Sequence, residues 1–387
     1  MTRQQSTDAS RRGEEGGAAR PLNEITPPVI FDELRRGVLG QDDALRYVSV
    51  ALYKHTTGKV PGNILLIGNS GTGKTTIMNN IQRLYHEVPE YAPFRAMTII
   101  NANLLVDGER LEFRPDRLLT AVEQRARAVI GHAPTAAELK ATMERATICI
   151  DEVDKMSAVV AGKPNAIGVV LQQGLLTLME GDKVPHAAHV LEDGEEKPRT
   201  LEIDTAGMMF ICGGAFEGLY DQVYLRVTTP GSGEKLRSTA TRSANGQVHI
   251  EARFVLGDFF KVDDLFQYGV VPQFTARFDN VVLLSDLNVD VLQQILLQAV
   301  DSPFVRSRKF LEVMGIALEI EDMAAALIAE QAEKQSRTGA RALRTIFGRI
   351  INPLEYDPEG NGTLEAGDDG SRKLVITADM VRSTLDL

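Results

Sequence analysis

A run of eight residues has the composition of a loop that binds nucleotide phosphates. It fits G-x-x-x-x-G-K-[ST] in full, through Gly68, Asn69, Ser70, Gly71, Thr72, Gly73, Lys74 and Thr75. Glycines let the backbone wrap an anion with its amide hydrogens pointing inward, and the N-terminus of a following helix adds partial positive charge. We expect Lys74 to hold the β- and γ-phosphates and Thr75 to bind Mg²⁺, with Thr76 at the edge of the same site. The alternative is a chance glycine loop, but the strand-like NILLIG before it and the helical TIMNNIQRL after it favour the phosphate loop.

Two carboxylates follow a second apolar strand, in TICIDE. A strand parallel to the one before the phosphate loop would bring Asp151 and Glu152 to the same edge of the sheet. Asp151 is then a second ligand of Mg²⁺, and Glu152 orients and deprotonates the attacking water. The alternative is a solvated strand end, which an isolated Asp-Glu pair would favour. Because a phosphate loop precedes the pair at this spacing, the catalytic interpretation is favoured, and it predicts hydrolysis of the nucleotide rather than binding alone.

The elements that position these residues follow from the alternation of short apolar runs with amphipathic stretches. This alternation predicts a wound α/β sheet. The candidate strands are Ile64–Ile67, Met97–Ile100, Thr147–Ile150, Met208–Cys212 and Asn280–Leu284. We expect residues 1–26 to be a disordered polar tail, 27–285 a large nucleotide-binding domain and 286–387 a small, mainly helical domain with a late strand at Lys373–Thr377. Two polar segments, His186–Thr200 and Thr228–His249, are expected to be loops or hairpins.

Composition narrows the classes of ligand and partner. The chain has 387 residues and a net charge of −11, which argues against nucleic acid because phosphate backbones need a basic surface. Its apolar runs are too short to cross a bilayer, and its first residues lack the apolar core of a signal peptide, so we expect a cytoplasmic protein without membrane contact. Cys149 and Cys212 lie in strand-like runs and are expected to be buried free thiols. The pair His186 and His189 could bind a metal ion, but without a third ligand a solvated loop is the better prediction.

Seven stretches together resemble one family, the ClpX protein unfoldases of the AAA+ class. They occur in the family's order over residues 30–355, and ICGGAFEGL and VVPQFTAR are the most specific. The stretches are GVLGQDDALRYVSVALYKH, GNILLIGNSGTGKTT, ICIDEVDKM, GVVLQQGLLTLMEG, MMFICGGAFEGL, DLFQYGVVPQFTARF and TGARALRTI. The resemblance implies an AAA+ P-loop fold, ATP and Mg²⁺ as cofactors, and a homo-hexameric ring with its nucleotide sites between subunits.

The resemblance also assigns roles that spacing alone does not. Val38, Leu39, Gly40 and Gln41 match the family's box on the adenine side of the nucleotide. Arg277 matches the arginine finger that reaches into a neighbour's site, and Arg341 matches the second sensor arginine of the small domain. An arginine beside the γ-phosphate stabilises transition-state charge. Without the resemblance, an exposed salt-bridging arginine and a solvated helix start would be the simpler interpretations.

Four departures from the family pattern bear on function. The family's zinc-binding N-terminal domain is replaced by the short polar tail, so docking through that domain is not expected. The stretch at the place of the family's central-pore loop, Val106–Phe113, is charged. It is either a modified pore loop, in which Leu111 or Phe113 grips a polypeptide, or an ordinary surface loop. The stretch Leu191–Arg199, which matches the family's basic pore-entrance loop, is mostly acidic, so the sign of its charge is reversed. The aliphatic-Gly-Phe loop that docks the partner peptidase is absent between Gly218 and Asp264.

These features predict an ATPase that remodels or disassembles a dedicated protein partner without a ClpP-type peptidase. The alternative is a structural or regulatory ring whose ATP cycle switches assembly with no threading of polypeptide. A nucleic-acid motor is a third possibility, which the acidic composition disfavours.

Overall fold

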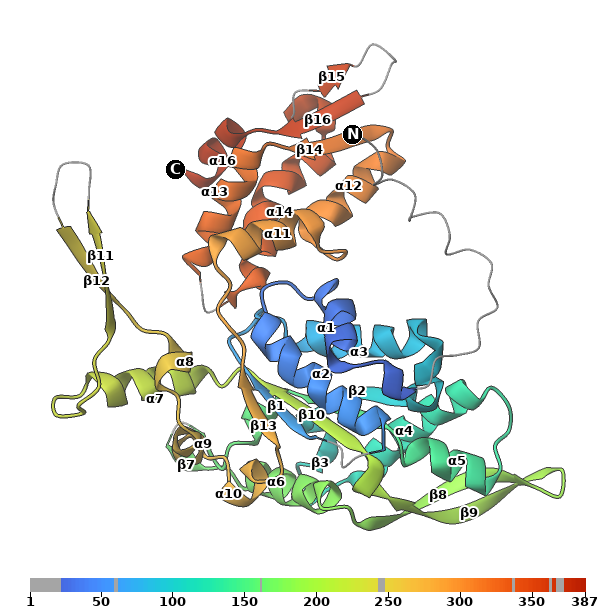
Figure 1. Cartoon of the computed structure of the whole chain (residues 1–387). Coiled ribbons are helices and arrows are strands. Elements are labelled where there is room, and N and C mark those ends of the chain that lie inside the picture. The colour runs from blue at the N-terminus through green and yellow to red at the C-terminus, as the bar shows by residue number, and fades with distance from the viewer. Residues whose placement is uncertain are drawn as a thin grey trace, which may run out of the picture.

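The computed structural model describes residues 22–58, 62–160, 162–242, 248–335, 338–361, 364–366 and 372–387. Its centre is a five-stranded parallel sheet in the order β13-β1-β10-β5-β2 (Figure 1). The strands are β1 (Ile64–Ile67), β2 (Met97–Asn101), β5 (Thr147–Asp151), β10 (Met209–Gly214) and β13 (Asn280–Leu283). All five predicted strands are therefore confirmed, with boundaries shifted by at most two residues.

Helices cover both faces of this sheet because alternate residues of each strand face opposite sides. In β1, Ile64 and Leu66 join one apolar core, whereas Leu65 and Ile67 join the other. The first core is closed by α1–α3 and the second by α4–α6 (Figure 1). These helices are α1 (Pro27–Arg35), α2 (Asp42–Thr56), α3 (Lys74–Glu87), α4 (Pro115–Ile130), α5 (Ala136–Met143) and α6 (Ala166–Met179).

The expected tail, residues 1–26, lies mostly outside the described residues. Its last part is an exception, because Leu22–Glu24 form a 3₁₀ helix and Ile25 is buried in the core beneath α1 and α2. The expectation of disorder is therefore wrong for residues 22–26. The cause is that Leu22 and Ile25 are apolar residues placed to cover the edge of that core.

The C-terminal residues form a unit with its own apolar core. It contains α11 (Val289–Gln298), α12 (Pro303–Val313), α13 (Asp322–Glu333), α14 (Ala340–Tyr356), α15 (Pro358–Asn361) and α16 (Ala378–Leu385). It also has a three-stranded sheet in the order β14-β16-β15, made of β14 (Ile316–Ile320), β15 (Leu364–Ala366) and β16 (Arg372–Ile376). The late strand was predicted, whereas β14, with its alternating Ile316 and Leu318, was missed.

Long and short hairpins extend from the sheet-bearing part (Figure 1). The two polar segments expected to be loops or hairpins belong to β8 (Lys183–Glu192) paired with β9 (Glu195–Asp204), and to β11 (Arg237–Arg242) paired with β12 (Val248–Arg253). The short hairpins pair β3 (Val106–Asp107) with β4 (Glu112–Phe113), and β6 (Val159–Val160) with β7 (Lys163–Pro164).

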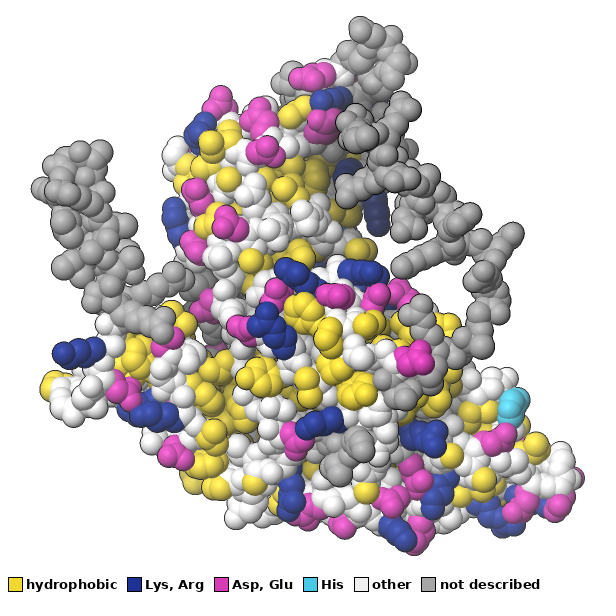
Figure 2. All heavy atoms as spheres, in the orientation of Figure 1, with side chains coloured by type: hydrophobic (Ala, Val, Ile, Leu, Met, Phe, Trp, Pro, Cys, Tyr) yellow, Lys and Arg dark blue, Asp and Glu magenta, His cyan; other side chains and the backbone are white. Residues whose placement is uncertain are grey.

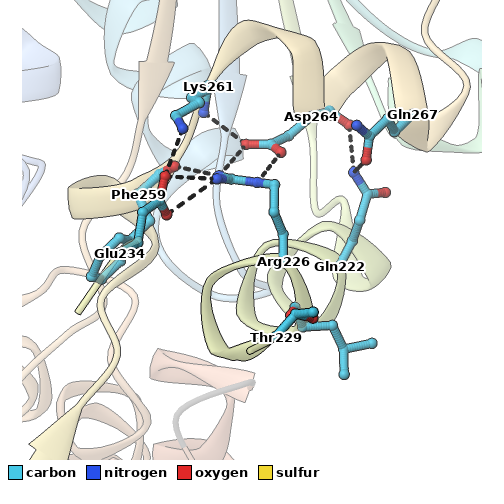
Figure 3. A network of polar contacts seen from close by, with 9 residues as sticks. Gln222, Arg226, Thr229, Glu234, Phe259, Lys261, Asp264 and Gln267 are labelled. Atoms are coloured by element: carbon cyan, nitrogen blue, oxygen red, sulfur yellow. Dashed lines mark hydrogen bonds and ion pairs between the residues drawn. The ribbon is translucent and has the colours of Figure 1, made fainter. Parts of the chain in front are cut away.

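A polar network fixes the chain on both sides of the β11–β12 hairpin (Figure 3). Arg226, on α7 (Glu217–Thr228), donates to both carboxylate oxygens of buried Asp264 at 2.9 and 3.1 Å and to both oxygens of Glu234 at 3.1 and 3.2 Å. Lys261 donates to Glu234 at 2.6 Å. Asp264 belongs to α9 (Val262–Tyr268), which follows α8 (Leu256–Phe259). Charge-assisted bonds of this kind hold the hairpin's base against α7 and α9.

The His186–His189 pair lies on β8 rather than in a solvated loop, so that prediction is wrong for His186. Its side chain is buried, and its Nε2 lies 2.7 Å from Glu123 on α4. Residues three apart on a strand point to opposite faces, so the two histidines do not converge on one ion. No cluster of three or more His, Cys, Asp or Glu within the described ranges could hold a metal ion.

His55, at the end of α2, predicts that the protein loses stability in mild acid. It is buried edge-to-face against Phe94, with ring centroids 5.0 Å apart, and its Nε2 has no hydrogen-bond partner among the described residues. Burial lowers the pKa of His55 from 6.5 to about 4, against a smaller opposing effect of its backbone hydrogen bond at Arg145. Because the unfolded chain binds a proton below pH 6.5 and the native chain does not, the free energy of unfolding should fall by about 3 kcal/mol between pH 6.5 and 4.

Chemical denaturation at several pH values checks this prediction. His55→Leu should flatten the dependence of unfolding free energy on pH in that window, since it removes the group that takes up the proton. His132→Asn, which replaces an exposed histidine, is the control and should keep the parental slope. An equally steep slope in His55→Leu would show that other groups cause the acid sensitivity.

Candidate nucleotide site

The phosphate loop joins the carboxyl end of β1 to the first residue of α3. Gly71 and Gly73 have positive φ angles of 77° and 111°, which favour glycine, and Gly73 precedes the helix directly. The loop is closed by Thr72, whose hydroxyl donates to the Asn69 carbonyl at 2.9 Å. The sequence motif therefore has the strand–loop–helix context that phosphate binding requires.

Lys74 is folded back into this loop. Its Nζ donates to the carbonyls of Gly68 and Asn69, the latter at 3.0 Å, and the side chain is buried. Burial lowers the pKa of Lys74, while the Asp151 carboxylate opposes that shift. A phosphate anion entering the loop offers stronger acceptors than two neutral carbonyls, so Lys74 can exchange those contacts for it.

Thr75 and Asp151 meet at the edge of the sheet, although β10 lies between their strands. The Thr75 hydroxyl donates to Asp151 Oδ2 at 2.7 Å, and both groups are hard oxygen ligands of the kind that Mg²⁺ prefers. Gly213, in β10, lies beside this pair, since a Cβ there would be in ordinary contact with Asp151 Oδ1 and Lys74 Cβ, each at 3.7 Å, and would come within 2.9 Å of Met78 Cε. Thr75 and Asp151 therefore fit a magnesium ion bound together with phosphate. The neighbouring Thr76, the first predicted residue past the motif, is exposed at the start of α3.

Glu152 stands directly beyond β5 with a positive φ of 60°. Its carboxylate accepts hydrogen bonds from Lys155 and from the Asn101 amide, and these two contacts, Lys155 first, lower the pKa of Glu152. It is therefore ionised at neutral pH, as a residue that orients or deprotonates water must be. The sequence reasoning missed Asn101. The available sequence signal was its place directly after the predicted strand Met97–Ile100, whereas the register that pairs it with Asp151 depends on the order of the strands.

The four residues assigned to the adenine side lie between the phosphate loop and the start of the C-terminal unit. Val38 and Gln41 are buried, Leu39 is half-buried, and Gly40 adopts a φ of 74° against Val291 of α11. The Gln41 amide donates to the carbonyls of Thr72 and Ser285, both at 2.9 Å, and accepts from the Ser285 amide at 3.0 Å. Gln41 thus ties the phosphate loop to the chain that leads into α11.

Arg341 comes from a distant part of the sequence to the same place. It lies in the first turn of α14, where the Ala340 amide donates to the Gly71 carbonyl at 3.1 Å. The lowered pKa of Lys74 is due mainly to burial, with a smaller effect of the Arg341 guanidinium. The same guanidinium contributes to the lowered pKa of Glu152, less than Lys155 and Asn101 do. The structure therefore brings Arg341, Lys74 and Glu152 within electrostatic range of one another.

Arg277 does not join this site. It precedes β13 and forms an ion pair with Glu180, whereas the phosphate loop follows β1 at the other end of the sheet. Since β13 and β1 run parallel over four residues, the two lie roughly 13 Å or more apart along the strands. Its side chain is about 42% exposed, so it remains accessible from outside the chain.

The two cysteines are buried and free, as predicted. Cys149 faces the core beneath α1–α3 and Cys212 faces the opposite core, and burial raises the pKa of both thiols. They therefore take no part in the site. In the described ranges, the helices are too short or too polar to cross a membrane.

Comparison with known proteins extends these observations. Residues 59–281 match the family described as AAA domain (Cdc48 subfamily). The chain is 28% identical over 366 residues to the ATP-dependent Clp protease ATP-binding subunit ClpX of Bacteroides thetaiotaomicron, covering 88% of this chain and 80% of that protein. It is also 28% identical over 376 residues to the subunit of the same name from Bacteroides fragilis, covering 90% of this chain and 82% of that protein.

Proposed function

The chain belongs to the AAA domain family and is a ClpX-like AAA+ ATPase, and we propose that it uses this activity to remodel or disassemble a dedicated protein partner. The observation that carries the ATPase chemistry is the meeting of Lys74, Thr75, Asp151 and Glu152 at one edge of the sheet. Lys74 holds the phosphates, Thr75 and Asp151 bind Mg²⁺, and Glu152 activates water. Gln41 and its neighbours Val38, Leu39 and Gly40 hold the nucleotide's base, and Arg341 senses its phosphates.

The proposal includes a homo-hexameric ring. Arg277 lies far from the nucleotide site of its own chain and is exposed, which supports a role in the site of a neighbouring subunit. Exposed apolar side chains gather over α1 and α2 (Figure 2), among them Val29, Tyr47 and Val50. Exposed apolar clusters of this kind mark association surfaces. The division into domains at residues 285 and 286 is also part of the proposal, and it is supported by the separate core that begins at Leu287.

Action without a ClpP-type peptidase is supported by the segment between Gly218 and Asp264. The aliphatic-Gly-Phe tripeptide is missing there, and the β11–β12 hairpin stands in its place on a base fixed by Arg226. The expected partners are therefore other copies of the chain and one protein client, in the cytoplasm, with neither nucleic acid nor membrane. Addition of a ClpP-type peptidase should produce no ATP-dependent proteolysis of an unfolded substrate such as casein.

The experiment that tests remodelling is capture of the client by a hydrolysis-deficient ring. Glu152→Gln should hold ATP and whatever protein it grips, so tagged Glu152→Gln is recovered from its native extract with ATP and with ADP. Proteins enriched only with ATP support the proposal and identify the client. If nothing beyond the chain itself is enriched, the alternative of an assembly switch is favoured.

The β3–β4 hairpin gives a sharper version of this test. Leu111, at its turn, is exposed, whereas Phe113 packs against α6, where a Cβ on Gly174 would meet its ring at 2.1 Å. Leu111 is thus free to grip a polypeptide and Phe113 is not. Leu111→Ala in the Glu152→Gln background should reduce ATP-dependent capture of the client about tenfold or more, because it removes about 1.5–3 kcal/mol of possible apolar contact.

The matched control for this prediction is Leu104→Ala. Leu104 is similarly exposed, on the 3₁₀ helix Ala102–Leu105 beside the hairpin, but outside its turn. Capture should survive this change. Equal capture by Leu111→Ala and the parent would argue against threading and for the assembly switch.

A further inference from the structure

Asn69 occupies a position to which the phosphate-loop motif assigns no role. The motif specifies the glycines, Lys74 and Thr75, and leaves residue 69 open. In the structure, the backbone and the side chain of Asn69 have different partners. Its carbonyl accepts from Lys74 Nζ at 3.0 Å and from the Thr72 hydroxyl at 2.9 Å. Its side-chain amide donates to Asp286 Oδ1 at 2.9 Å, a residue 217 positions away.

Asp286 lies in the short connection between β13 and α11, the chain's entry into the C-terminal unit. The preceding residue, Ser285, is held on both its amide and its carbonyl by Gln41, which also bonds Thr72. This connection is therefore attached to the phosphate loop at two successive residues. One attachment passes through a buried amide, and the other passes through Asn69.

A second part of the C-terminal unit touches the same loop. Gly339 lies directly against Gly71, since a Cβ on Gly339 would meet the Gly71 carbonyl oxygen at 2.9 Å, and the Ala340 amide donates to that oxygen at 3.1 Å. Arg341 follows at once. Because α11 and α14 share one close-packed apolar core, we expect a shift at Asp286 to move Arg341 as well.

We propose that Asn69 and Asp286 are a pair of positioning residues that sets the orientation of the C-terminal unit, and with it the position of Arg341. This orientation depends on whether Lys74 contacts the loop carbonyls or a phosphate. When phosphate binds, Lys74 leaves the Asn69 carbonyl, because its ammonium hydrogens are needed by the anion. The Asn69 carbonyl then loses one of its two hydrogen-bond donors, while the Asn69 side chain still holds Asp286. The pair thus connects occupancy of the site to the approach of Arg341. This inference rests on the proposed nucleotide site.

The test is a double-mutant cycle in the full chain with a conservative variant. Asn69→Ala and Asp286→Ala should each lower kcat for ATP about three- to tenfold, the effect of losing one hydrogen bond, with a smaller change in the dissociation constant of Mg²⁺–ADP. The double variant should be no worse than either single one, since both act through the same contact. Asp286→Asn keeps a carbonyl acceptor for the Asn69 amide and should restore most of the parental rate.

A distance measurement separates positioning from mere stability. Spin labels on cysteines introduced at Thr120 of α4 and Val313 of α12, both exposed, report the orientation of the C-terminal unit, and native Cys149 and Cys212 are buried. In the Glu152→Gln background, ATP should change the distance distribution, and Asn69→Ala or Asp286→Ala should broaden it.

Three results would overturn the inference. They are additive losses in the cycle, failure of Asp286→Asn to restore the rate, and a distance distribution that ATP changes equally in parent and variants. An unchanged distance in a parent that binds ATP would overturn it as well. A parent that binds no Mg²⁺–ADP contradicts the proposed nucleotide site itself, and the inference falls with it.

Discussion

Glu152→Gln should lower kcat for ATP hydrolysis by roughly 10²–10⁴-fold, the usual effect of losing a positioned general base. The amide that replaces the carboxylate cannot accept a proton, yet it has nearly the shape of glutamate and can still contact Asn101. The phosphate contacts of Lys74 and the magnesium ligands Thr75 and Asp151 are untouched. The dissociation constant for Mg²⁺–ATP should therefore stay close to the parental value, and the variant should accumulate bound ATP.

The measurement is steady-state phosphate release together with direct titration by a fluorescent ATP analogue. Glu144→Gln is the matched control, because it makes the same change at the other end of β5, where Glu144 accepts from the Asp204 amide at 2.8 Å. It should retain hydrolysis. A Glu152→Gln variant with near-parental kcat would show that water is activated elsewhere, and one that no longer binds ATP would show that Glu152 holds the nucleotide.

The parts of this site that sequence reasoning finds are those written in contiguous residues. The phosphate loop and Asp151–Glu152 each follow an apolar strand, so a local pattern predicts both their shape and the edge of the sheet at which they lie. The strands themselves were found for the same reason. The thiols of Cys149 and Cys212 were also predicted as buried, because they lie within those apolar runs.

The parts that it misses depend on which strands become neighbours. Nothing local places β10 between β1 and β5, and yet this strand order decides that Thr75 and Asp151 come within hydrogen-bonding distance. Asn101 reaches Glu152 only because β2 pairs with β5. His186 was misjudged because its polar segment gave no sign of packing against Glu123 of α4.

Contacts across the largest sequence separations are the least predictable and the most informative about coupling. Gln41 bonds Ser285 across 244 positions, and Asn69 bonds Asp286 across 217. Both partners come from polar residues that any surface loop could contain. The resemblance to ClpX assigned Gln41 and Arg341 to one nucleotide site, and the structure adds the links between the phosphate loop and the C-terminal unit.

Arg277→Ala should lower kcat by about 10³-fold or more while the chain still binds ATP, because an arginine finger stabilises charge that develops only in the transition state. Arg277→Lys should restore little, since an ammonium group lacks the planar fork of a guanidinium. The control is Glu180→Ala, which removes the ion-pair partner of Arg277 and leaves its guanidinium available. Loss of activity in Glu180→Ala as well would indicate that the ion pair, rather than the finger, is what matters.

Mixing two inactive variants distinguishes a finger that acts between subunits from any role within one chain. An Arg277→Ala subunit has an intact nucleotide site but no finger, whereas a Glu152→Gln subunit has a finger but cannot activate water. An interface is complete where the nucleotide site of an Arg277→Ala subunit receives the arginine finger of a neighbouring Glu152→Gln subunit. Random mixing in equal amounts should therefore restore about a quarter of the parental interfaces and a corresponding fraction of the ATPase rate. If the mixture stays as inactive as its components, Arg277 acts within its own chain. Arg277 and the phosphate loop would then have to come together by a rearrangement, which the parallel pairing of β13 with β1 does not permit.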